Sequence, residues 1–300
     1  MSHAYTPRRT AISREISVRG LQIHLLQWGQ PASGRPLRVF THGYMDIGAS
    51  FQFVVDAMTD DACVLAPDWR GFGRSQAPPG TDAYWFADYL GDLDGLLQAV
   101  SPDAAVDLLG HSMGGNIVMA YAGVRPARVR RLVNLEGFGL PDLPPAQAPA
   151  RLAQWLDELR QPQRLKDYAS LDEVAARLRQ NNPRLPTDKS VWLAGQWAQP
   201  TPDGRWALRA DAAHRRVNPV PYRAAEAVAA WAAISASLLW VQGRASHPER
   251  WWGGRYSLTE FEARLAVVPR LQRLLLDDAG HMLHHDQPEA LALALMDFLA

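Results

Sequence analysis

The chain has little cysteine, little lysine and no excess charge of either sign. Its 300 residues include one cysteine, Cys63, and the 31 basic and 31 acidic side chains cancel to a formal net charge of zero. One cysteine excludes an internal disulfide and a zinc site made of several thiolates. Cys63 lies in an apolar run, which favours a place in the protein core. The balanced charge gives no support for a nucleic-acid partner.

Long hydrophobic runs are also missing. No stretch of about 18 apolar residues occurs, so we expect neither a membrane-spanning helix nor a membrane partner. The N-terminal residues carry charge with no apolar stretch behind them, unlike a secretory signal peptide. A hydrophobic content of 47% with 21% charged residues excludes a disordered chain. Together these features predict a folded, cytoplasmic protein.

Short apolar runs alternate with helical patterns over the first 140 residues. Two strands are expected at 12–18 and 21–28, joined by Arg19-Gly20, which is a hairpin signal. Further buried strands are expected at 37–41, 62–66, 105–109 and 129–135, and helices at 50–59, 84–100 and 114–124. This alternation is typical of an α/β fold with a mostly parallel sheet covered by helices on both faces. Such folds bind ligands outside the carboxyl ends of their strands.

The alternation stops after Leu140. Residues 141–150 are rich in proline and alanine, like a linker, and residues 151 to about 233 have helical patterns, five tryptophans and no clear strand. Strand patterns return at 237–241 and 271–276, before a C-terminal helix that starts at Pro288. We therefore predict an α/β core made of residues 1–140 and 236–300, with a helical cap, or lid, inserted at 141–235.

Residues 110–114 read Gly-His-Ser-Met-Gly, between an expected strand and an expected helix. A Gly-x-Ser-x-Gly turn at such a place forms a nucleophile elbow, in which a strained serine projects at the head of the helix. The glycines leave room where the strand and the helix crowd together. Ser112 is therefore the expected nucleophile. The backbone N–H of the next residue, Met113, can point at a developing oxyanion.

With this motif, the chain resembles the α/β-hydrolase superfamily along essentially its whole length. The supporting runs are His42-Gly-Tyr-Met-Asp46, Asp68-Trp-Arg-Gly-Phe-Gly-Arg-Ser75 and Gly280-His281. Within the superfamily the chain resembles the serum-hydrolase-like group of capped serine hydrolases. The resemblance implies the α/β-hydrolase fold and makes the backbone N–H of Tyr44 a second oxyanion donor. A sharp turn at Gly43 would aim that N–H into the site, and a plain strand-to-helix turn is the alternative.

A serine nucleophile needs a base, and a histidine is the usual one. Nine histidines are present, and His281 occupies the position of the base in the superfamily, after the strand expected at 271–276. His284 and His285 follow closely and are expected to be surface or packing residues. His111 neighbours the nucleophile, but its side chain is expected to point away from the elbow.

The acid that orients this histidine departs from the commoner pattern of the superfamily. Most relatives place an aspartate shortly after the glycine that ends the strand following the insert, but here Gly243 leads to Ser246. Some relatives place the acid at the mouth of the insert, where this chain has Glu136. An unpaired carboxylate in that apolar run would be costly to bury, so a partner such as a histidine is expected. We predict Glu136 as the acid, with Glu249 as the alternative.

The aromatic residues of the expected cap have two interpretations. They line an apolar pocket above Ser112, in which case Trp206 joins Gly43, Tyr44 and Met113 as a substrate-binding residue, or they form the cap's own core. The segment 196–222 also carries several arginines. One of these arginines would suit the binding of a substrate carboxylate. The alternative is that they are solvated at the surface or form salt bridges with the core, which is commoner for arginines.

These residues predict acyl transfer to Ser112, followed by hydrolysis of the acyl-enzyme. The reaction requires no metal and no organic cofactor. Relatives that cleave epoxides or haloalkanes attack an sp³ carbon with an aspartate, so a serine favours carbonyl chemistry. We expect a carboxylic ester hydrolase whose partner is a small-molecule substrate with a small, apolar acyl group. C–C bond, lactone or thioester hydrolysis and non-catalytic ligand binding are the alternatives. The oligomeric state stays open, a homodimer included.

Overall fold

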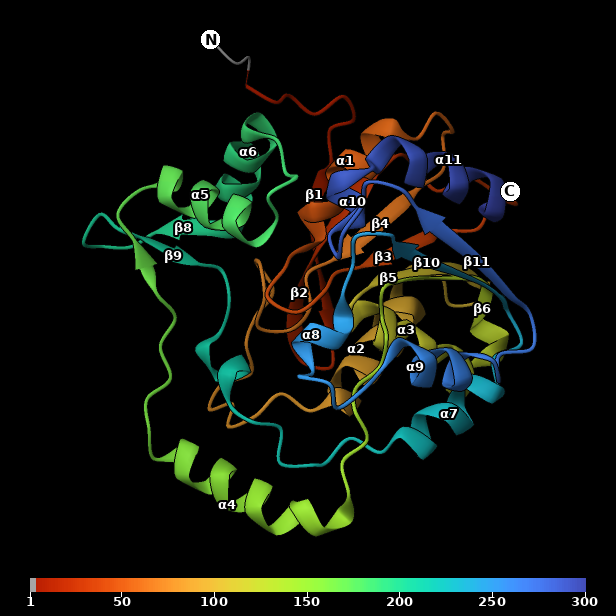
Figure 1. Ribbon diagram of the computed structural model, residues 1–300. Coiled ribbons are helices and arrows are strands. Elements are labelled where there is room, and N and C mark those ends of the chain that lie inside the picture. Colours follow the sequence, from red (N-terminus) through yellow and green to blue (C-terminus); the bar gives the residue numbers. More distant parts are fainter. Residues whose placement is uncertain (1–3) are drawn as a thin grey trace.

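The computed structural model describes residues 4–300, which are built around an eight-stranded sheet (Figure 1). The spatial order of the strands is β1–β2–β4–β3–β5–β6–β10–β11. β2 is antiparallel to both of its neighbours, and the remaining neighbours run parallel, as predicted for this α/β fold. The strands are β1 (Ile12–Val18), β2 (Leu21–Trp28), β3 (Arg38–Thr41), β4 (Val64–Pro67), β5 (Val106–His111), β6 (Val129–Leu135), β10 (Ser237–Gly243) and β11 (Leu271–Leu276).

Helices cover both faces of this sheet (Figure 1). One large apolar cluster is built under α2 (Phe86–Val100), α3 (Met113–Val124), α7 (Ala224–Ala232) and α9 (Leu258–Leu265). A second cluster is built under α1 (Gln52–Ala57), α10 (Leu283–Asp286) and α11 (Pro288–Leu299). Short 3₁₀ turns lie at Gly48–Phe51, Pro126–Arg128, Pro145–Gln147 and Ala212–Arg215. Among residues 4–300, no helix combines the length and the apolar content needed to cross a bilayer.

The pairing of β5, β6 and β10 brings distant segments together at the carboxyl edge of the sheet. His111, the last residue of β5, pairs with Leu135 of β6, which in turn pairs with Val241 of β10. The next residues continue this contact, because the N–H of Ser112 donates to the Leu135 carbonyl and the N–H of Glu136 donates to the Val241 carbonyl. Residues far apart in sequence therefore meet beside the elbow.

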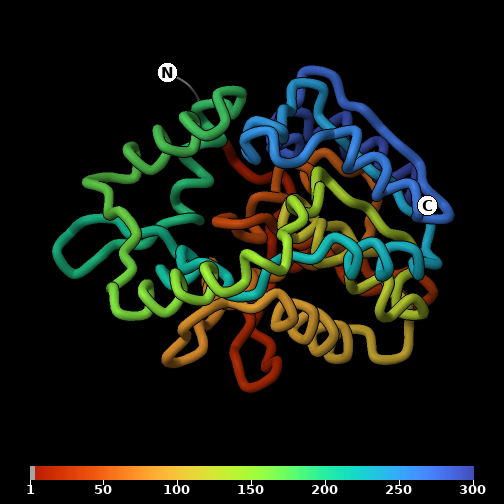
Figure 2. Tube along the Cα trace, turned by 60° about the horizontal axis from the view of Figure 1, so that its bottom comes forward, coloured from red at the N-terminus to blue at the C-terminus, as the bar shows by residue number. Residues whose placement is uncertain are grey.

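The chain leaves the sheet after β6 and forms a separate lobe, green to teal in Figures 1 and 2, before it returns. Its helices are α4 (Ala148–Leu159), α5 (Leu171–Asn181) and α6 (Thr187–Trp197). Three short strands, β7 (Asp167–Tyr168), β8 (Ala198–Pro200) and β9 (Trp206–Leu208), form a small antiparallel sheet. The sequence pattern predicted a purely helical insert. These strands show that the insert also contains a small sheet. Strands of two or three residues are too short to show a period-two alternation.

The helix α7 belongs by packing to the core, although the predicted cap extended to residue 235. Its Trp231 is 2% exposed and lies in the apolar cluster that includes α3. Gly123 of α3 approaches α7 so closely that a Cβ there would lie 1.9 Å from the Ala230 carbonyl oxygen. The lobe that stands away from the sheet therefore ends before α7.

Candidate active site

Ser112 occupies the sharp turn between β5 and α3. Its φ of 52° and ψ of −113° lie outside the regions that residues with a side chain favour. Close packing requires the flanking glycines. A Cβ on Gly110 would lie 2.3 Å from the Gly114 carbonyl oxygen, and one on Gly114 would lie 2.4 Å from the Thr41 carbonyl oxygen. The backbone strain and the glycines together are the geometry of a nucleophile elbow.

Ser112, His281 and Glu136 form one hydrogen-bonded chain. The Oγ atom of Ser112 lies 3.0 Å from Nε2 of His281, and Nδ1 of the same ring lies 2.8 Å from Oε2 of Glu136. An ionised carboxylate only accepts hydrogen bonds, so Nδ1 carries the ring proton and Nε2 offers a lone pair to the serine hydroxyl. The structure thus brings together the three residues that the sequence analysis selected.

Glu136 is held by three donors at the end of β6, where it is 1% exposed. Besides His281, the backbone N–H of Gly243 donates to Oε1 at 2.8 Å and the hydroxyl of Ser246 donates to Oε2 at 2.7 Å. Burial raises the pKa of the Glu136 carboxyl, and the bonds from Ser246 and Gly243 oppose that rise. Burial also lowers the pKa of His281, which favours the neutral ring that a base needs.

The alternative acid, Glu249, has another contact. It lies in α8 (Pro248–Trp251), and its Oε1 accepts a hydrogen bond from the backbone N–H of Leu258. Ser246, which stands where most relatives would have the acid, donates to Glu136 instead. The residue at the position where most relatives have the acid is therefore a hydrogen-bond donor to Glu136.

The three histidines near the elbow are buried. His284 and His285 are 0% and 3% exposed, so they are packing residues and the surface alternative is wrong. His111 forms no hydrogen bond with the serine hydroxyl among residues 4–300, and its Nε2 donates to the backbone carbonyl of His281 at 2.8 Å. His111 therefore supports the segment that carries the base.

The backbone on the other side of Ser112 comes from Gly43 and Tyr44. A Cβ on Gly43 would lie 3.2 Å from the Cβ of Ser112, which explains the glycine at this place. Tyr44 is 50% exposed, and its hydroxyl donates to the His214 carbonyl at 3.0 Å. Met113 opens α3, so its backbone N–H has no acceptor within the helix. The N–H groups of Tyr44 and Met113 stay the predicted oxyanion donors.

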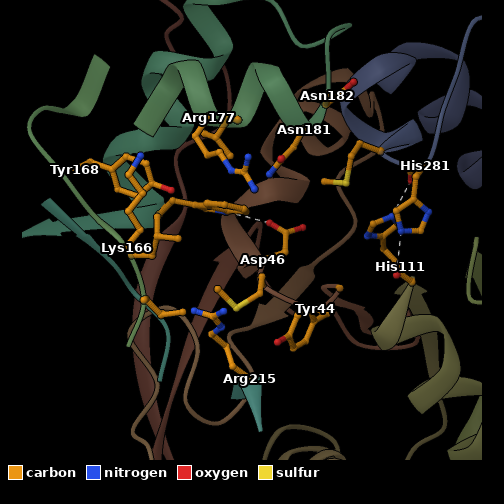
Figure 3. Close-up of a pocket in the computed structure, with 18 residues that line it drawn as sticks. Tyr44, Asp46, His111, Lys166, Tyr168, Arg177, Asn181, Asn182, Arg215 and His281 are labelled. Atoms are coloured by element: carbon orange, nitrogen blue, oxygen red, sulfur yellow. Dashed lines mark hydrogen bonds between the residues drawn. The ribbon is translucent and has the colours of Figure 1, made fainter. Parts of the chain in front are cut away.

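A cavity of about 490 Å³ opens beside Ser112 and His281 (Figure 3). Gly43 and Tyr44 line it, in agreement with their predicted place, whereas Met113 and Trp206 do not. Trp206 is partly buried and packs against an apolar cluster that joins cap residues to Ile47, Ala49 and Phe53 of the core. Trp206 is thus not among the residues that line this cavity, and the cluster that it joins belongs to the cap and the core together.

The cap contributes cationic side chains to the cavity: Lys166, Arg177 and Arg215. Figure 3 shows Arg177 and Arg215 reaching into it from opposite sides. Arg177 donates to the side-chain oxygen of Gln180, and Arg215 donates to the backbone carbonyl of Arg164. None of the three cations forms an ion pair with an acidic side chain in residues 4–300. Arg215 lies in the arginine-bearing segment singled out from the sequence, whereas Lys166 and Arg177 were missed.

Two further residues near the site were also missed. The ring of Trp251 in α8 packs edge-to-face on His281, with 4.4 Å between the ring centroids. Asp46 lines the cavity, and its Oδ1 accepts a 3.0 Å hydrogen bond from the indole N–H of Trp197. Asp46 stands in the His-Gly run already noted in the sequence, but nothing local indicates that it faces the cap.

Comparison with known proteins agrees with this geometry. Residues 38–288 match the family described as the alpha/beta hydrolase fold. The 3-hydroxybutyrate-oligomer hydrolase of Cupriavidus necator is 29% identical over 279 residues, which are 89% of each chain. Epoxide hydrolase A of Mycobacterium tuberculosis is 32% identical over 137 residues, which are 45% of this chain and 41% of that protein. The thioesterase domain from the curacin biosynthetic pathway superposes with a TM-score of 0.84 at 26% identity, covering 96% of this chain and 99% of that domain.

These relatives carry the names of hydrolases with several different substrates, so they support hydrolysis without selecting one bond. The resemblance to the serum-hydrolase-like group stays a prediction. The family match covers well over half of the chain, and the sheet order and the elbow agree with it. The chain is therefore a member of the alpha/beta hydrolase family.

Proposed function

We propose that this protein is a serine hydrolase that cleaves carboxylic esters through an acyl-enzyme. The observation that carries the proposal is the continuous chain from the Ser112 hydroxyl through the His281 ring to the buried Glu136 carboxylate. A hydroxyl, an imidazole and a carboxylate in this order are the parts needed for nucleophilic attack on a carbonyl. Water can then complete hydrolysis, and no other group is required.

The reaction uses each group in turn. His281 Nε2 takes the proton from Ser112 as Oγ bonds to the carbonyl carbon, and the carbonyl π electrons move to its oxygen. The backbone N–H groups of Tyr44 and Met113 stabilise that oxyanion. As the tetrahedral intermediate collapses, His281 gives its proton to the departing alkoxide. Water then attacks the acyl-enzyme in the same way and regenerates Ser112, while Glu136 stabilises the imidazolium in both steps.

The nucleophile argues against epoxide opening as the main activity. That chemistry forms an alkyl ester between a carboxylate and an sp³ carbon, whereas a serine would form an ether that water does not readily hydrolyse. The elbow holds Ser112, and the Glu136 carboxylate is hydrogen-bonded to His281, Gly243 and Ser246. Similarity to an epoxide hydrolase therefore supports the fold and hydrolysis rather than the substrate.

The cavity favours substrates that carry a negative charge. Arg177, Arg215 and Lys166 line it without acidic partners, and such groups attract a carboxylate in a partly enclosed site. This modifies the expectation of a purely apolar acyl group. The 3-hydroxybutyrate-oligomer hydrolase matched above is named for oligomers that hold ester bonds and end in a carboxylate. We infer that short esters with an anionic end are the preferred substrate class.

The first test is a panel of activated esters with the purified protein. Short p-nitrophenyl esters are expected to give an initial burst of p-nitrophenol, stoichiometric with enzyme when deacylation is slow, which Ser112→Ala abolishes. A butyryl thioester and a vinylogous diketone in the same panel compare ester with thioester and C–C cleavage. The thioester arm is included because of the similarity to the curacin thioesterase domain. Turnover of the diketone alone would contradict the ester proposal.

The second test compares two esters of equal chain length. The p-nitrophenyl hemiester of glutarate is anionic, and p-nitrophenyl pentanoate is neutral. We expect a higher kcat/KM for the hemiester, and Arg177→Gln or Arg215→Gln should each lower that preference about fivefold, the equivalent of ~1 kcal/mol for a partly exposed charge pair. Arg160→Gln, at the residue that follows α4 and pairs with Asp157, is the matched control. An unchanged preference in both cavity variants would contradict the anionic substrate class.

A further inference from the structure

A cluster of buried polar side chains lies behind the proposed triad. Asp46, His111 and His284 are 4%, 2% and 0% exposed. They belong to the loop after β3, the end of β5 and α10, respectively. Each offers one atom able to bind a cation, and these atoms lie within 4.8 Å of one another. None of the three belongs to the hydrogen-bonded chain of Ser112, His281 and Glu136.

Several polar atoms of this cluster have no hydrogen-bond partner among residues 4–300. They are Oδ2 of Asp46, Nδ1 of His111 and both ring nitrogens of His284. Buried polar groups are nearly always paired, because each unpaired group costs the energy of its desolvation. The distance of 3.9 Å between Nε2 of His284 and Oδ2 of Asp46 is too long for a hydrogen bond. One bound group that contacts all three side chains would therefore satisfy the unpaired atoms of Asp46, His111 and His284.

The tautomer of His111 leaves an unpartnered acceptor in this cluster. Its Nε2 faces the backbone carbonyl of His281, which can only accept, so Nε2 carries the proton. In the neutral ring, Nδ1 of His111 consequently carries no proton and presents a lone pair. Oδ1 of Asp46 accepts hydrogen bonds from Ser50 and Trp197, which leaves Oδ2 as the unpartnered oxygen of this carboxyl group.

We propose that Asp46, His111 and His284 form a binding site for a late first-row transition-metal dication such as Zn²⁺. Two imidazoles and one carboxylate are a donor set that suits these metals better than Mg²⁺ or Ca²⁺, which prefer oxygen ligands. Ligand atoms around tetrahedral zinc lie about 3.3 Å apart, given Zn–N and Zn–O lengths of about 2.0–2.2 Å. The candidate atoms lie within 4.8 Å of one another, so binding requires the side chains to move closer.

The cluster is buried but borders the cavity, and none of its side chains belongs to the hydrogen-bonded chain of the proposed triad. Asp46 and His111 line the cavity beside Ser112, so a fourth coordination position could face that space. A bound metal would fix the His111 ring, which holds the backbone carbonyl of His281. We therefore expect occupancy to stabilise the fold by mass action and to raise the melting temperature. The ester chemistry proposed above needs no metal, so this inference does not depend on it.

The test is calorimetric titration of Zn²⁺ into the untagged protein after treatment with a chelator and dialysis. We expect one strong site per chain, and His284→Gln should weaken it by at least about 100-fold, more than the loss of an outer-sphere partner usually costs. Asp46→Asn is the second variant, because it keeps the shape of the carboxylate if His284→Gln fails to fold. Co²⁺ should give the absorption bands of a four-coordinate site in the wild type.

Two controls distinguish this site from other places where zinc could bind. His247→Gln removes an exposed histidine and should leave binding unchanged. Glu136→Gln alters the proposed triad and should also leave binding unchanged. If wild-type protein binds no stoichiometric zinc, the cluster is not a metal site. Binding that survives His284→Gln and Asp46→Asn but is lost in Glu136→Gln would place the metal at the triad and overturn the proposal.

Discussion

The hydroxyl of Ser246 donates a 2.7 Å hydrogen bond to Oε2 of Glu136, the same oxygen that lies 2.8 Å from Nδ1 of His281. Ser246 stands after β10, where most relatives place an acid, and Glu136 stands after the neighbouring strand β6. A carboxylate at the end of either strand can thus approach the same ring. In this chain the carboxylate that contacts His281 follows β6, and Ser246 donates a hydrogen bond to it.

Removing that donor should change the pH dependence of hydrolysis. The bond from Ser246 lowers the pKa of Glu136, so Ser246→Ala raises it. Glu136 must be ionised to hold His281, and activity is lost as pH falls through the pKa of the coupled pair. The acid limb of kcat/KM should therefore move to higher pH in Ser246→Ala, with a decrease of about tenfold near neutrality. A decrease in rate with an unmoved limb would contradict this role.

The assignment of the acid can be tested with two glutamates. Glu136→Gln keeps the shape of the side chain but favours the wrong histidine tautomer, so kcat should fall by about 10²–10⁴-fold, as for other triad acids. Glu249→Gln is the matched control and should cost little, since its carboxylate accepts from the Leu258 backbone. Steady-state kinetics with one activated ester suffice. An equal decrease in kcat in both variants would show that Glu136 is not the triad acid.

Ser112→Ala should remove activity and leave the fold intact. Ala retains the Cβ that the elbow already accommodates at φ 52°, and the Ser112 hydroxyl has no partner beyond His281 among residues 4–300. Losing a triad nucleophile costs about 10⁴-fold or more in kcat. Far-UV circular dichroism and thermal melting report on the fold in the same samples. Activity within tenfold of wild type would show that another group attacks the substrate.

The cap should exchange its amide protons faster than the sheet. Helix α4 buries no side chain and stands away from the sheet in Figure 1, whereas every residue of β5 is buried. Local stability follows buried contacts, so the amides of Ala148–Leu159 should open at lower free energy than those of Val106–His111. Hydrogen exchange with mass spectrometry measures both segments in one experiment. Equal protection would indicate a rigid cap and a preformed cavity.

Much of the core could be predicted because its signals are local. The apolar runs at 129–135 and 271–276 coincide with β6 and β11, and the Arg19-Gly20 turn has the positive φ values of 49° and 80° that a tight hairpin needs. The position of Ser112 also follows from local geometry, since neighbouring glycines are required wherever strand and helix meet this closely. The prediction of Glu136 combined the resemblance to relatives that place the acid after this strand with the cost of burying a carboxylate and the serine at residue 246.

The cavity could not be predicted in the same way, because it depends on how the insert folds back over the core. Arg177 lies in the middle of α5, where an arginine is usually a solvated residue, and only the tertiary arrangement directs it to the cavity. Trp206 was misplaced for the same reason, since an indole suits a pocket wall and a small core equally well. The packing of α7 on α3 likewise rests on a close approach at Gly123 that the sequence pattern does not show.

The central claim is that Ser112 is a nucleophile activated by His281 and Glu136. The most direct measurement is reaction of the folded protein with a fluorophosphonate, followed by mass spectrometry of the digested protein. The account predicts one adduct per chain, on the peptide that contains Ser112, absent in Ser112→Ala and formed more slowly in Glu136→Gln. An unlabelled wild-type protein, or an adduct on a different residue, would contradict it.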